Sequence, residues 1–446
     1  MSDDYYGSES YPDPDRDFWE SRPILSHIHQ SAVSRRRGPW AVLLNVLINV
    51  TAHVPPGFVL PPIVGGYQPL NLIGIAVGGS GVGKDSARAV ANSAVIFPEL
   101  DNVPVIPLGS AQGISKSYKR FVPAKRATKD APAEPAHFQI LTDRAIFTVT
   151  EVNTAEAHGD MSATLRDQIK QAWTGSELGY GYADPEKRIV LDAMSYRFAL
   201  IIGAQPTESN WLLQGAGDGF PQRLIWLPAH NLYSPKHRKD CPEMPAPILW
   251  KGIEWPAPKP GEYVEFRLPE DIEDRIWNEV GKGNETILGS GLDGHKIQGI
   301  ERVAIALAVL DGRIDVTHED WRIAEKIFAR SDETRTFIED HVKRRKLDAL
   351  SEKAKERVLV DIRAQGYQSN YDTGIATKTY QQMLLKLAEA TGPVLTSVLI
   401  RSLTANLRPS APEVLERMDD DGVILRTEGK SSNGRIVEWI SSKDAP

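Results

Sequence analysis

A glycine-rich stretch, AVGGSGVGKDSA (76–87), constrains the fold of this chain more than any other feature. It matches the pattern G-x-x-x-x-G-K-[ST] at its glycines and at Lys84, but Asp85 stands where a hydroxyl is expected and Ser86 arrives one position late. The apolar run LNLIGIAV before it has the length of a strand buried on both faces of a parallel sheet. The sequence therefore predicts a phosphate-binding loop between a buried strand and a helix.

This loop offers the groups that hold the phosphates of a nucleotide. Its glycines let backbone N–H groups converge on phosphate oxygens, and KDSARAVANSAV reads as a helix whose N-terminus carries partial positive charge. We expect Lys84 to reach the β- and γ-phosphates, and the alternative is an ordinary glycine-rich turn of an α/β protein. The predicted ATP-binding residues are Gly78, Gly79, Ser80, Gly81, Val82, Gly83, Lys84, Asp85 and Ser86.

A P-loop enzyme also needs an acidic element on another strand, to order magnesium and the attacking water. RAIFTVTEV supplies one, with Glu151 at the carboxyl end of an apolar run, where ligands bind in open α/β sheets. Thr150 takes the place of the usual aspartate before this glutamate. We hypothesise a swapped magnesium shell, in which the carboxylate of Asp85 comes from the loop and the hydroxyl of Thr150 from the strand. The alternatives are that Ser86 serves the metal through a shifted helix start, or that metal binding is weak.

Two further polar residues belong to later strands. The apolar run RFALIIGAQP carries Gln205 near its carboxyl end, where we expect this side chain to orient water or to sense the γ-phosphate. The alternative is a buried strand that ends in a Gln-Pro turn. GDGFPQRLIWLPA carries Arg223 after a glycine segment and before a fourth strand. An arginine in this place reaches a neighbour's phosphate in ring-forming ATPases, and a surface salt bridge is the alternative.

Composition and the positions of proline- and glycine-rich stretches divide the chain into segments. With 446 residues it is too long for one ordinary domain, and its net charge of −7 provides no general basic field for nucleic acid. The single Cys241 fits a reducing, cytoplasmic compartment, and no apolar run reaches membrane-spanning length, so we expect no membrane contact. We expect a disordered acidic tail (1–17), an N-terminal helical module (18–62), an ATPase core (63–233), a proline-rich connection (234–267), a helical lid (268–346) and a C-terminal domain (347–446).

One segment of the expected core, SKSYKRFVPAKRATKD (115–130), interleaves cations with aromatic residues. Lysines and arginines track a phosphate backbone and aromatic rings offer stacking surface, the combination expected of a channel for single-stranded DNA. A solvated charged loop is the alternative. The candidate DNA-binding residues are Lys116, Tyr118, Lys119, Arg120, Phe121, Lys125, Arg126 and Lys129.

The C-terminal segment predicts a winged-helix-like domain. PVLTSVLIRSLTANL and APEVLERMDDDGV read as two helices, and ILRTEGKSSNGRIVEWI reads as two short strands around a turn. The acidic residues of RMDDDG would repel phosphate, so protein contact or packing competes with DNA binding. The DNA contacts expected here are Arg401, Arg408, Arg417 and Lys430.

In order along the chain, these motifs resemble the replicative helicase family of phages and mobile elements, P-loop ATPases often fused to primase-polymerase domains. The resemblance rests on GGSGVGKD, LGSAQGISKSY, VTEV, IIGAQP, GDGFPQRLIWLP and VAIALAVLDGRIDVTHEDWRIA, the last similar to the lid of MCM-type AAA+ helicases. It spans roughly Phe18 to Arg330. The departures are Asp85, Thr150 and Gln205, the last standing where AAA+ proteins more often have asparagine.

The resemblance implies an AAA+-like P-loop core and an ATP- and Mg²⁺-dependent motor, a homo-oligomeric hexameric ring that moves on single-stranded DNA. No primase-polymerase domain fits in the residues before Phe18, so we expect a separate primase or polymerase chain to supply any priming that is needed. Lys84 would hold the phosphates, Glu151 would polarise the attacking water, and Arg223 would act on a neighbouring subunit's nucleotide. An ATP-switched initiator or helicase loader with slow hydrolysis is the alternative, and a structural ATPase without nucleic acid is a third. Whether Lys296 or Arg302 is a second phosphate sensor stays open.

Overall fold

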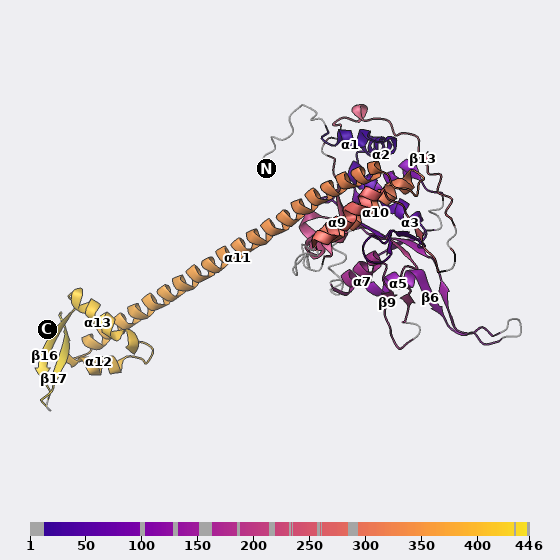
Figure 1. Ribbon diagram of the computed structural model, residues 1–446. Coiled ribbons are helices and arrows are strands. Elements are labelled where there is room, and N and C mark those ends of the chain that lie inside the picture. Colours follow the sequence, from indigo (N-terminus) through magenta and orange to yellow (C-terminus); the bar gives the residue numbers. More distant parts are fainter. Residues whose placement is uncertain are drawn as a thin grey trace. The chain divides into compact units, whose positions relative to one another are not determined.

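The computed structural model describes residues 13–443 apart from 99–102, 128–132, 151–162, 185–187, 214–218, 232, 234, 257–258, 260, 284–292 and 432–433. The chain divides into two compact units, Met1–Arg344 and Arg345–Pro446. Their boundary lies within helix α11 (His318–Ala388), and Figure 1 labels the elements. Within the described ranges, none of the helices combines the length and apolar character needed to cross a bilayer.

The first unit is built on a sheet of five parallel strands in the order β12-β3-β11-β8-β5. Strands β3 and β11 are buried along their whole length, as their continuous apolar runs predict. Helices cover the sheet, so the predicted α/β class is confirmed, and the arrangement is consistent with a P-loop-like core (Figure 1). The strands are β3 (Leu72–Val77), β5 (Val105–Pro107), β8 (Arg144–Val149), β11 (Arg197–Ala204) and β12 (Ile225–Pro228).

The register of the sheet brings the carboxyl ends of three strands to one edge. Strand β11 pairs with β3 up to Ala204↔Val77 and with β8 up to Ile202↔Val149. The glycine loop follows β3 directly, and Thr150 follows β8. Segments far apart in the sequence therefore meet where ligands bind in open parallel sheets.

Helix α3 (Pro39–His53) covers one face of the sheet, and all of its residues are buried. It packs against β3 and β11 and is itself covered by α2 (Pro23–Ser34), α4 (Lys84–Ala94) and α10 (Asp293–Leu310). A helix surrounded in this way is apolar on all sides instead of along one stripe. The segment expected as a separate N-terminal module is therefore a layer of the same core as the sheet.

The opposite face of the sheet packs against α5 (Ala111–Tyr118), α7 (Ala163–Thr174) and the first part of α11. Large rings fill this second core, among them Trp173 and Trp226. Helix α9 (Glu270–Gly283) and α10, expected as part of a separate lid, share the core of α3. The expected divisions within residues 18–344 thus fall inside one compact unit.

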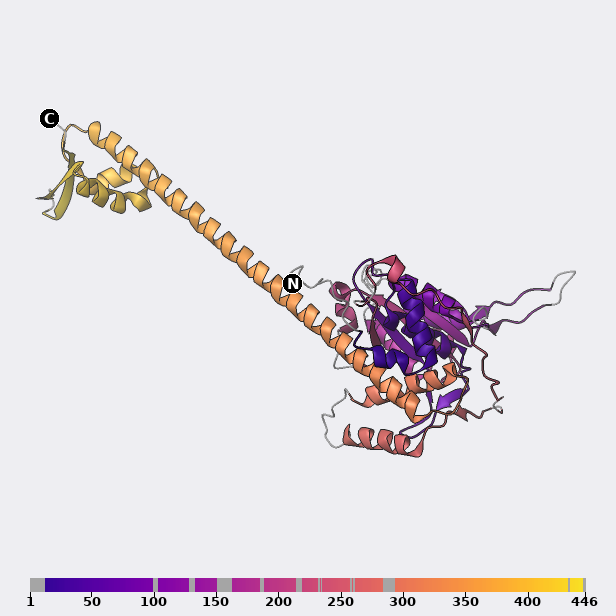
Figure 2. The ribbon, with the colours of Figure 1, turned by 90° about the horizontal axis from the view of Figure 1, so that it is seen from above.

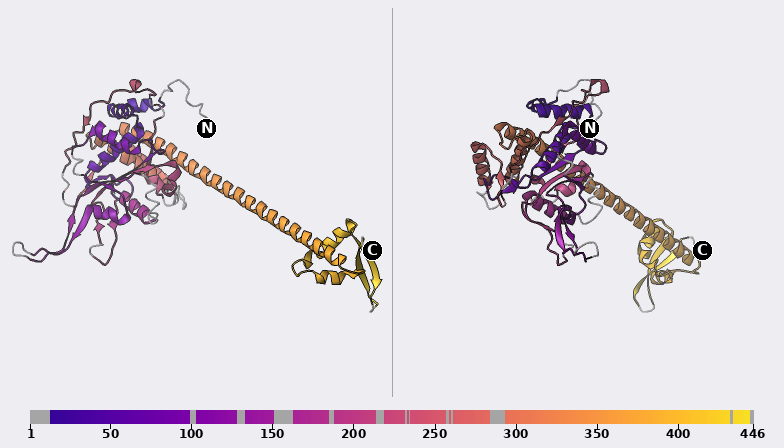
Figure 3. Two further views of the ribbon diagram at one scale, coloured as in Figure 1. Left: turned by 180° about the vertical axis from the view of Figure 1, so that it is seen from behind. Right: turned by 90° about the vertical axis from the view of Figure 1, so that its right-hand side faces the viewer.

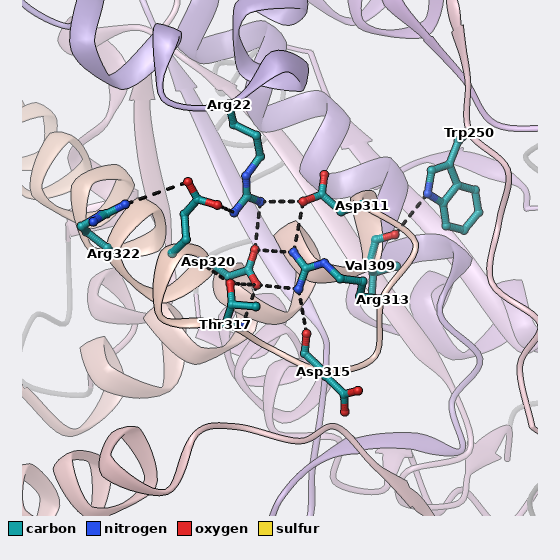
Figure 4. A network of polar contacts seen from close by, with 10 residues as sticks. Arg22, Trp250, Val309, Asp311, Arg313, Asp315, Thr317, Asp320 and Arg322 are labelled. Carbon is teal, nitrogen blue, oxygen red and sulfur yellow. Dashed lines mark hydrogen bonds and ion pairs between the residues drawn. The ribbon is translucent and has the colours of Figure 1, made fainter.

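A polar network around the buried side chains of Arg22 and Asp320 ties the start of α2 to the start of α11 (Figure 4). The Arg22 guanidinium donates to Asp320 at 2.9 Å and pairs with Asp311 at 3.0 Å, while Arg313 donates to both Asp320 oxygens at 2.9 Å. Asp320 also accepts from the backbone of Thr317, whose hydroxyl accepts from Asp320 N–H, which forms a capping box. Burial raises the pKa of Asp320, but these hydrogen bonds outweigh it and hold the pKa below its ordinary value.

The second unit has a core of its own, formed by the end of α11, two short helices and a three-stranded sheet in the order β15-β17-β16. Buried Leu399, Val414 and Ile440 belong to this core. Two helices followed by a hairpin are the order that the sequence predicts. The elements are β15 (Val394–Leu395), α12 (Thr396–Ser402), α13 (Ala411–Asp420), β16 (Ile424–Lys430) and β17 (Ile436–Ser442).

Short elements complete the first unit. A hairpin of β6 (Lys119–Val122) and β7 (His137–Ile140) projects from its body in Figures 1 and 2 and in the left-hand view of Figure 3. The others are α1 (Arg16–Glu20), β1 (Phe58–Leu60), β2 (Gln68–Pro69), β4 (Val95–Ile96), β9 (Leu178–Gly179), β10 (Val190–Leu191), α8 (Asn210–Leu213), β13 (Ile248–Leu249) and β14 (Val264–Glu265).

Candidate nucleotide-binding site

The glycine loop has the backbone that its sequence predicts. Gly81 and Gly83 have φ angles of 78° and 84°, in the left-handed region that favours glycine. Helix α4 begins at Lys84, immediately after Gly83. The loop therefore presents a helix N-terminus, with its partial positive charge, at the carboxyl edge of the sheet.

Lys84 crosses this edge toward the neighbouring strands. Its Nζ donates to the carbonyl oxygens of Gly78 at 2.9 Å and Gly79 at 3.0 Å. A Cβ atom added to Gly203, at the end of β11, would lie 3.5 Å from Cε of Lys84 and 2.5 Å from the carbonyl oxygen of Thr150. The missing side chain at Gly203 thus lets the lysine and the end of β8 approach β11 closely.

A pocket of about 120 Å³ opens at the same edge. It brings together Asp85 and Thr150, the two residues of the predicted swapped metal shell, beside Lys84. Ser86 does not line it, and its hydroxyl donates to the carbonyl of Gly83 at 2.9 Å. The lining residues are Asn45, Ala76, Lys84, Asp85, Arg88, Thr148, Val149, Thr150, Ile201 and Gly203.

The donor set of this pocket fits magnesium. Among the described residues, no group of three or more His, Cys, Asp or Glu side chains could hold a metal ion. Mg²⁺, however, keeps several waters and is usually held by one or two carboxylates together with substrate phosphates. The carboxylate of Asp85 and the hydroxyl of Thr150 would hold the ion in that way.

Three polar residues of the pocket, Arg88, Asn45 and Thr148, were not predicted from the sequence. Arg88 lies one turn after Lys84 on the same face of α4, and this spacing was the available signal. Burial lowers the pKa of the Arg88 guanidinium, and the charge of Asp85 acts in the opposite direction. Asn45 is one of the buried polar residues of the mainly apolar helix α3, and Thr148 lies in β8, two residues before Thr150.

The other predicted catalytic residues have different positions. Glu151 lies outside the described residues. Gln205 follows β11 at the carboxyl edge, where its carbonyl accepts from the hydroxyl of Ser209 at 2.5 Å, but its side chain does not line the pocket.

Arg223 precedes β12 at the opposite, amino edge of the sheet, because Ile225 pairs with Gly74 and Pro228 with Val77. Its Nη1 donates to the carbonyl of Gly219 at 2.7 Å, and its guanidinium lies 5.4 Å from the ring centre of Trp173. Arg223 is therefore separated from the glycine loop of its own chain by the length of a strand.

The two candidate phosphate sensors are engaged elsewhere. Arg302 is fully buried, stacks 3.8 Å from the ring centre of Trp173 and donates to the carbonyl of Pro69. Burial lowers the pKa of Arg302 to about 9. Lys296 pairs with Asp332 at 2.7 Å. Arg302 is thus a packed core cation, and Lys296 belongs to a partly exposed ion pair.

The hairpin β6–β7 carries most of the predicted DNA-binding residues. Lys119 lies 5.0 Å from the ring centre of Phe138, and Phe121 packs edge-on against the same ring. Arg120 donates to Gln139 at 2.8 Å, and Lys125 pairs with Glu134 at 2.9 Å. The hairpin leaves Phe138 41% exposed, so an aromatic surface lies beside the cations. Lys116 and Arg126 are exposed, and Lys129 lies outside the described residues.

Tyr118 is a correction to the predicted DNA-binding set. Its side chain is 1% exposed, and its hydroxyl donates to the carbonyl of Arg197 at 2.9 Å. Burial raises the pKa of this phenol well above its ordinary value. Tyr118 therefore belongs to the core beneath the sheet and offers no stacking surface.

In the second unit, the side chains predicted to contact DNA differ in how far they are engaged by the protein itself. Arg401 is exposed, whereas Arg408 donates to the carbonyls of Leu403 at 3.0 Å and Arg401 at 2.9 Å. Arg417 lies 4.0 Å from Asp421, one of the acidic residues at the end of α13. Lys430 is the last residue of β16.

A scan of protein-family models and a search of curated proteins returned no match to this sequence.

Proposed function

We propose that this chain is a P-loop ATPase that uses Mg²⁺-ATP to move along single-stranded DNA. The observation that carries the proposal is the pocket at the carboxyl edge of the parallel sheet. There the glycine loop and the start of α4 place Lys84 beside Asp85 and Thr150. A helix N-terminus, a lysine and two oxygen ligands are the groups that a nucleoside triphosphate with its metal requires.

The residues have distinct roles in this proposal. Lys84 exchanges the carbonyls of Gly78 and Gly79 for β- and γ-phosphate oxygens, while the loop N–H groups hold the phosphate chain. Magnesium, held by Asp85 and Thr150, would neutralise charge on the β- and γ-phosphates. Glu151 orients the attacking water, whose oxygen bonds to the γ-phosphorus as the bond to the bridging oxygen of ADP breaks.

Two features support coupling to DNA and assembly into a ring. The hairpin β6–β7 arises at the amino edge, just before β8, and combines exposed cations with the exposed ring of Phe138. Arg223 also lies at that edge, so it would complete the pocket of a neighbouring subunit in a homo-oligomer, for which a hexamer is our proposal. The second unit, with its helix-helix-hairpin order, is winged-helix-like and would dock DNA or a replication partner such as a primase.

The first experiment is ATP hydrolysis with magnesium, with and without single-stranded DNA, for wild type, Lys84→Ala and Glu151→Gln. We expect DNA to raise the rate several-fold and both variants to lose it. The paired substitution Arg120→Ala/Arg126→Ala on the hairpin should remove the stimulation by DNA while the rate without DNA persists. ATP binding without turnover under any condition would contradict the motor and favour an ATP-switched initiator or loader.

The metal shell is tested by Asp85→Ala against Ser86→Ala. Since Asp85 lines the pocket and Ser86 bonds to its own loop, we expect only the first substitution to abolish magnesium-dependent turnover. Loss of turnover in Ser86→Ala with retention in Asp85→Ala would end the swapped-shell hypothesis.

A further inference from the structure

The turn between α2 and α3 has a tightly defined backbone. Arg36 N–H donates to the carbonyl of Val33 at 3.0 Å and Arg37 N–H to that of Ala32 at 2.9 Å, the two bonds of a Schellman motif. Arg36 occupies the left-handed position with φ 53°, where glycine is usual. The direction of the chain at Arg37 is therefore set by hydrogen bonds and not by a mobile loop.

Gly38, the residue after Arg37, packs this turn against the end of β12. A Cβ atom added to Gly38 would clash with the carbonyl oxygen of Ala229, and one added to Gly78 would lie 3.2 Å from Cβ of Ala229. Pro39 then begins the fully buried helix α3. The turn and the first glycine of the phosphate loop thus pack on the same residue, Ala229.

This packing places the side chain of Arg37 on the glycine loop. A Cβ atom added to Gly83 would lie 2.7 Å from Nη1 and 2.8 Å from Cζ of Arg37, and 2.6 Å from the hydroxyl of Ser86. Arg37 is half-buried, and Nη1 donates to the carbonyl of Arg36 at 3.2 Å. Within the described part of the chain, no carboxylate forms an ion pair with Arg37. Its charge lies beside a helix N-terminus that already favours anions, an arrangement that an anion would stabilise.

The charged groups of Arg37 and Lys84 lie at opposite ends of the glycine loop, because the Lys84 side chain reaches back to Gly78 and Gly79. Lys84 bonds to the carbonyls of Gly78 and Gly79, beside Thr150 and the end of β11, where the terminal phosphates and the attacking water belong. Arg37 lies at Gly83 and on the Ser86 side of α4, away from the pocket lined by Asp85. A phosphate chain that runs along the loop from Lys84 would bring its α-phosphate end to Arg37.

We propose that Arg37 binds the α-phosphate end of the nucleotide, as a second cation supplied by the turn between α2 and α3. This inference rests on the proposed function, since it names a further ligand of the same nucleotide. A guanidinium there binds both ADP and ATP, because both carry the α-phosphate, and it makes no contact with the transferred γ-phosphate. Arg37 therefore sets nucleotide affinity, while Lys84 distinguishes ATP from ADP.

The test measures binding of ATP, ADP and adenosine by calorimetry to wild type, Arg37→Ala, Arg37→Lys and Arg35→Ala. Arg35 is the matched control, because it is an exposed arginine of the same turn. We expect Arg37→Ala to weaken ATP and ADP by the same factor, about tenfold, which is about 1.4 kcal/mol. Arg37→Lys should recover part of this loss, and Arg35→Ala should bind both nucleotides as wild type does.

The outcomes separate this inference from the proposed function. Wild-type affinity of Arg37→Ala for both nucleotides, or a loss confined to ATP, would overturn the role of Arg37 and leave the ATP site standing. A wild-type protein that binds neither ATP nor ADP would overturn both proposals. Equal thermal unfolding of wild type and Arg37→Ala without nucleotide, with a smaller upward shift by ADP in the variant, would support direct binding, since stabilisation by a ligand follows its affinity.

Discussion

Gly203 is the residue at which the candidate site should tolerate added volume least. A Cβ atom there would lie 2.5 Å from the carbonyl oxygen of Thr150, whereas ordinary contact begins near 3.4 Å, so one of the two must retreat by about 0.9 Å. This oxygen belongs to the main chain just after β8, whose ladder with β11 continues to Ile202↔Val149. It cannot rotate away as a flexible side chain would.

From this geometry Gly203→Ala should affect both stability and activity. Forcing volume into a packed region costs about 1–3 kcal/mol, and we expect the free energy of unfolding to fall by that amount. A misplacement of about 1 Å at a reacting centre can cost ~10²-fold in rate, so ATP turnover should fall at least about tenfold. Lys84 adds to the effect, because its Cε would be 3.5 Å from the new methyl group.

Urea unfolding and magnesium-dependent ATP hydrolysis would measure the two effects. Gly66→Ala is the matched control, because an added Cβ there meets no atom within 4 Å and its φ is not left-handed. It should change stability by less than about 0.5 kcal/mol and leave turnover unchanged. If Gly203→Ala behaved like Gly66→Ala in both assays, the close approach of β8 and β11 at the site would be refuted.

Three further substitutions test other parts of the structure. Arg197→Met should lower the free energy of unfolding, measured in urea, by about 3–5 kcal/mol. The buried guanidinium donates to Asn71 and to three main-chain carbonyls, and these four acceptors would lose their partner. A change below about 1 kcal/mol would contradict this. Arg36→Gly should raise the melting temperature, since it removes a left-handed φ of 53° from a non-glycine residue at a cost of about 1 kcal/mol; a lower melting temperature would count against the strain. Glu301 is buried, which raises the pKa of its carboxyl from 4.5 to about 8, so the native state holds a proton that the unfolded chain releases between these values. Wild-type stability should therefore fall relative to Glu301→Gln as the pH rises from 5 to 8, and parallel pH profiles of the two melting temperatures would exclude this.

Local patterns predicted the parts of the site that local chemistry builds. The apolar run of β3, the glycines with positive φ and the helix beginning at Lys84 follow from residues adjacent in the sequence. The approach of Asp85 to Thr150 was predictable from the rule that parallel strands end at one edge. Arg37 was not predicted to matter, because SRRRGPW reads as a solvated helix end and its contact with Gly83 depends on how α3 packs.

Tyr118 was assigned wrongly for a related reason. Its neighbours Lys119 and Arg120 suggested a nucleic acid surface, but Tyr118 ends α5 one turn after Ile114, on the buried face of that helix. The spacing of four residues was the usable signal. The segment of α3 likewise carried its own signal, since an apolar pattern on all sides of a helix indicates a central layer.

The two edges of the sheet have a consequence for how such a chain can diversify. The glycine loop and the hairpin β6–β7 lie at opposite ends of β8, a strand that spans ~20 Å at ~3.3 Å per residue. Replacing residues 119–140 by a short turn would alter what the amino edge recognises without moving an atom of the carboxyl edge. If the proposed function holds, one nucleotide-binding core would thus accept a different hairpin for a different polymer.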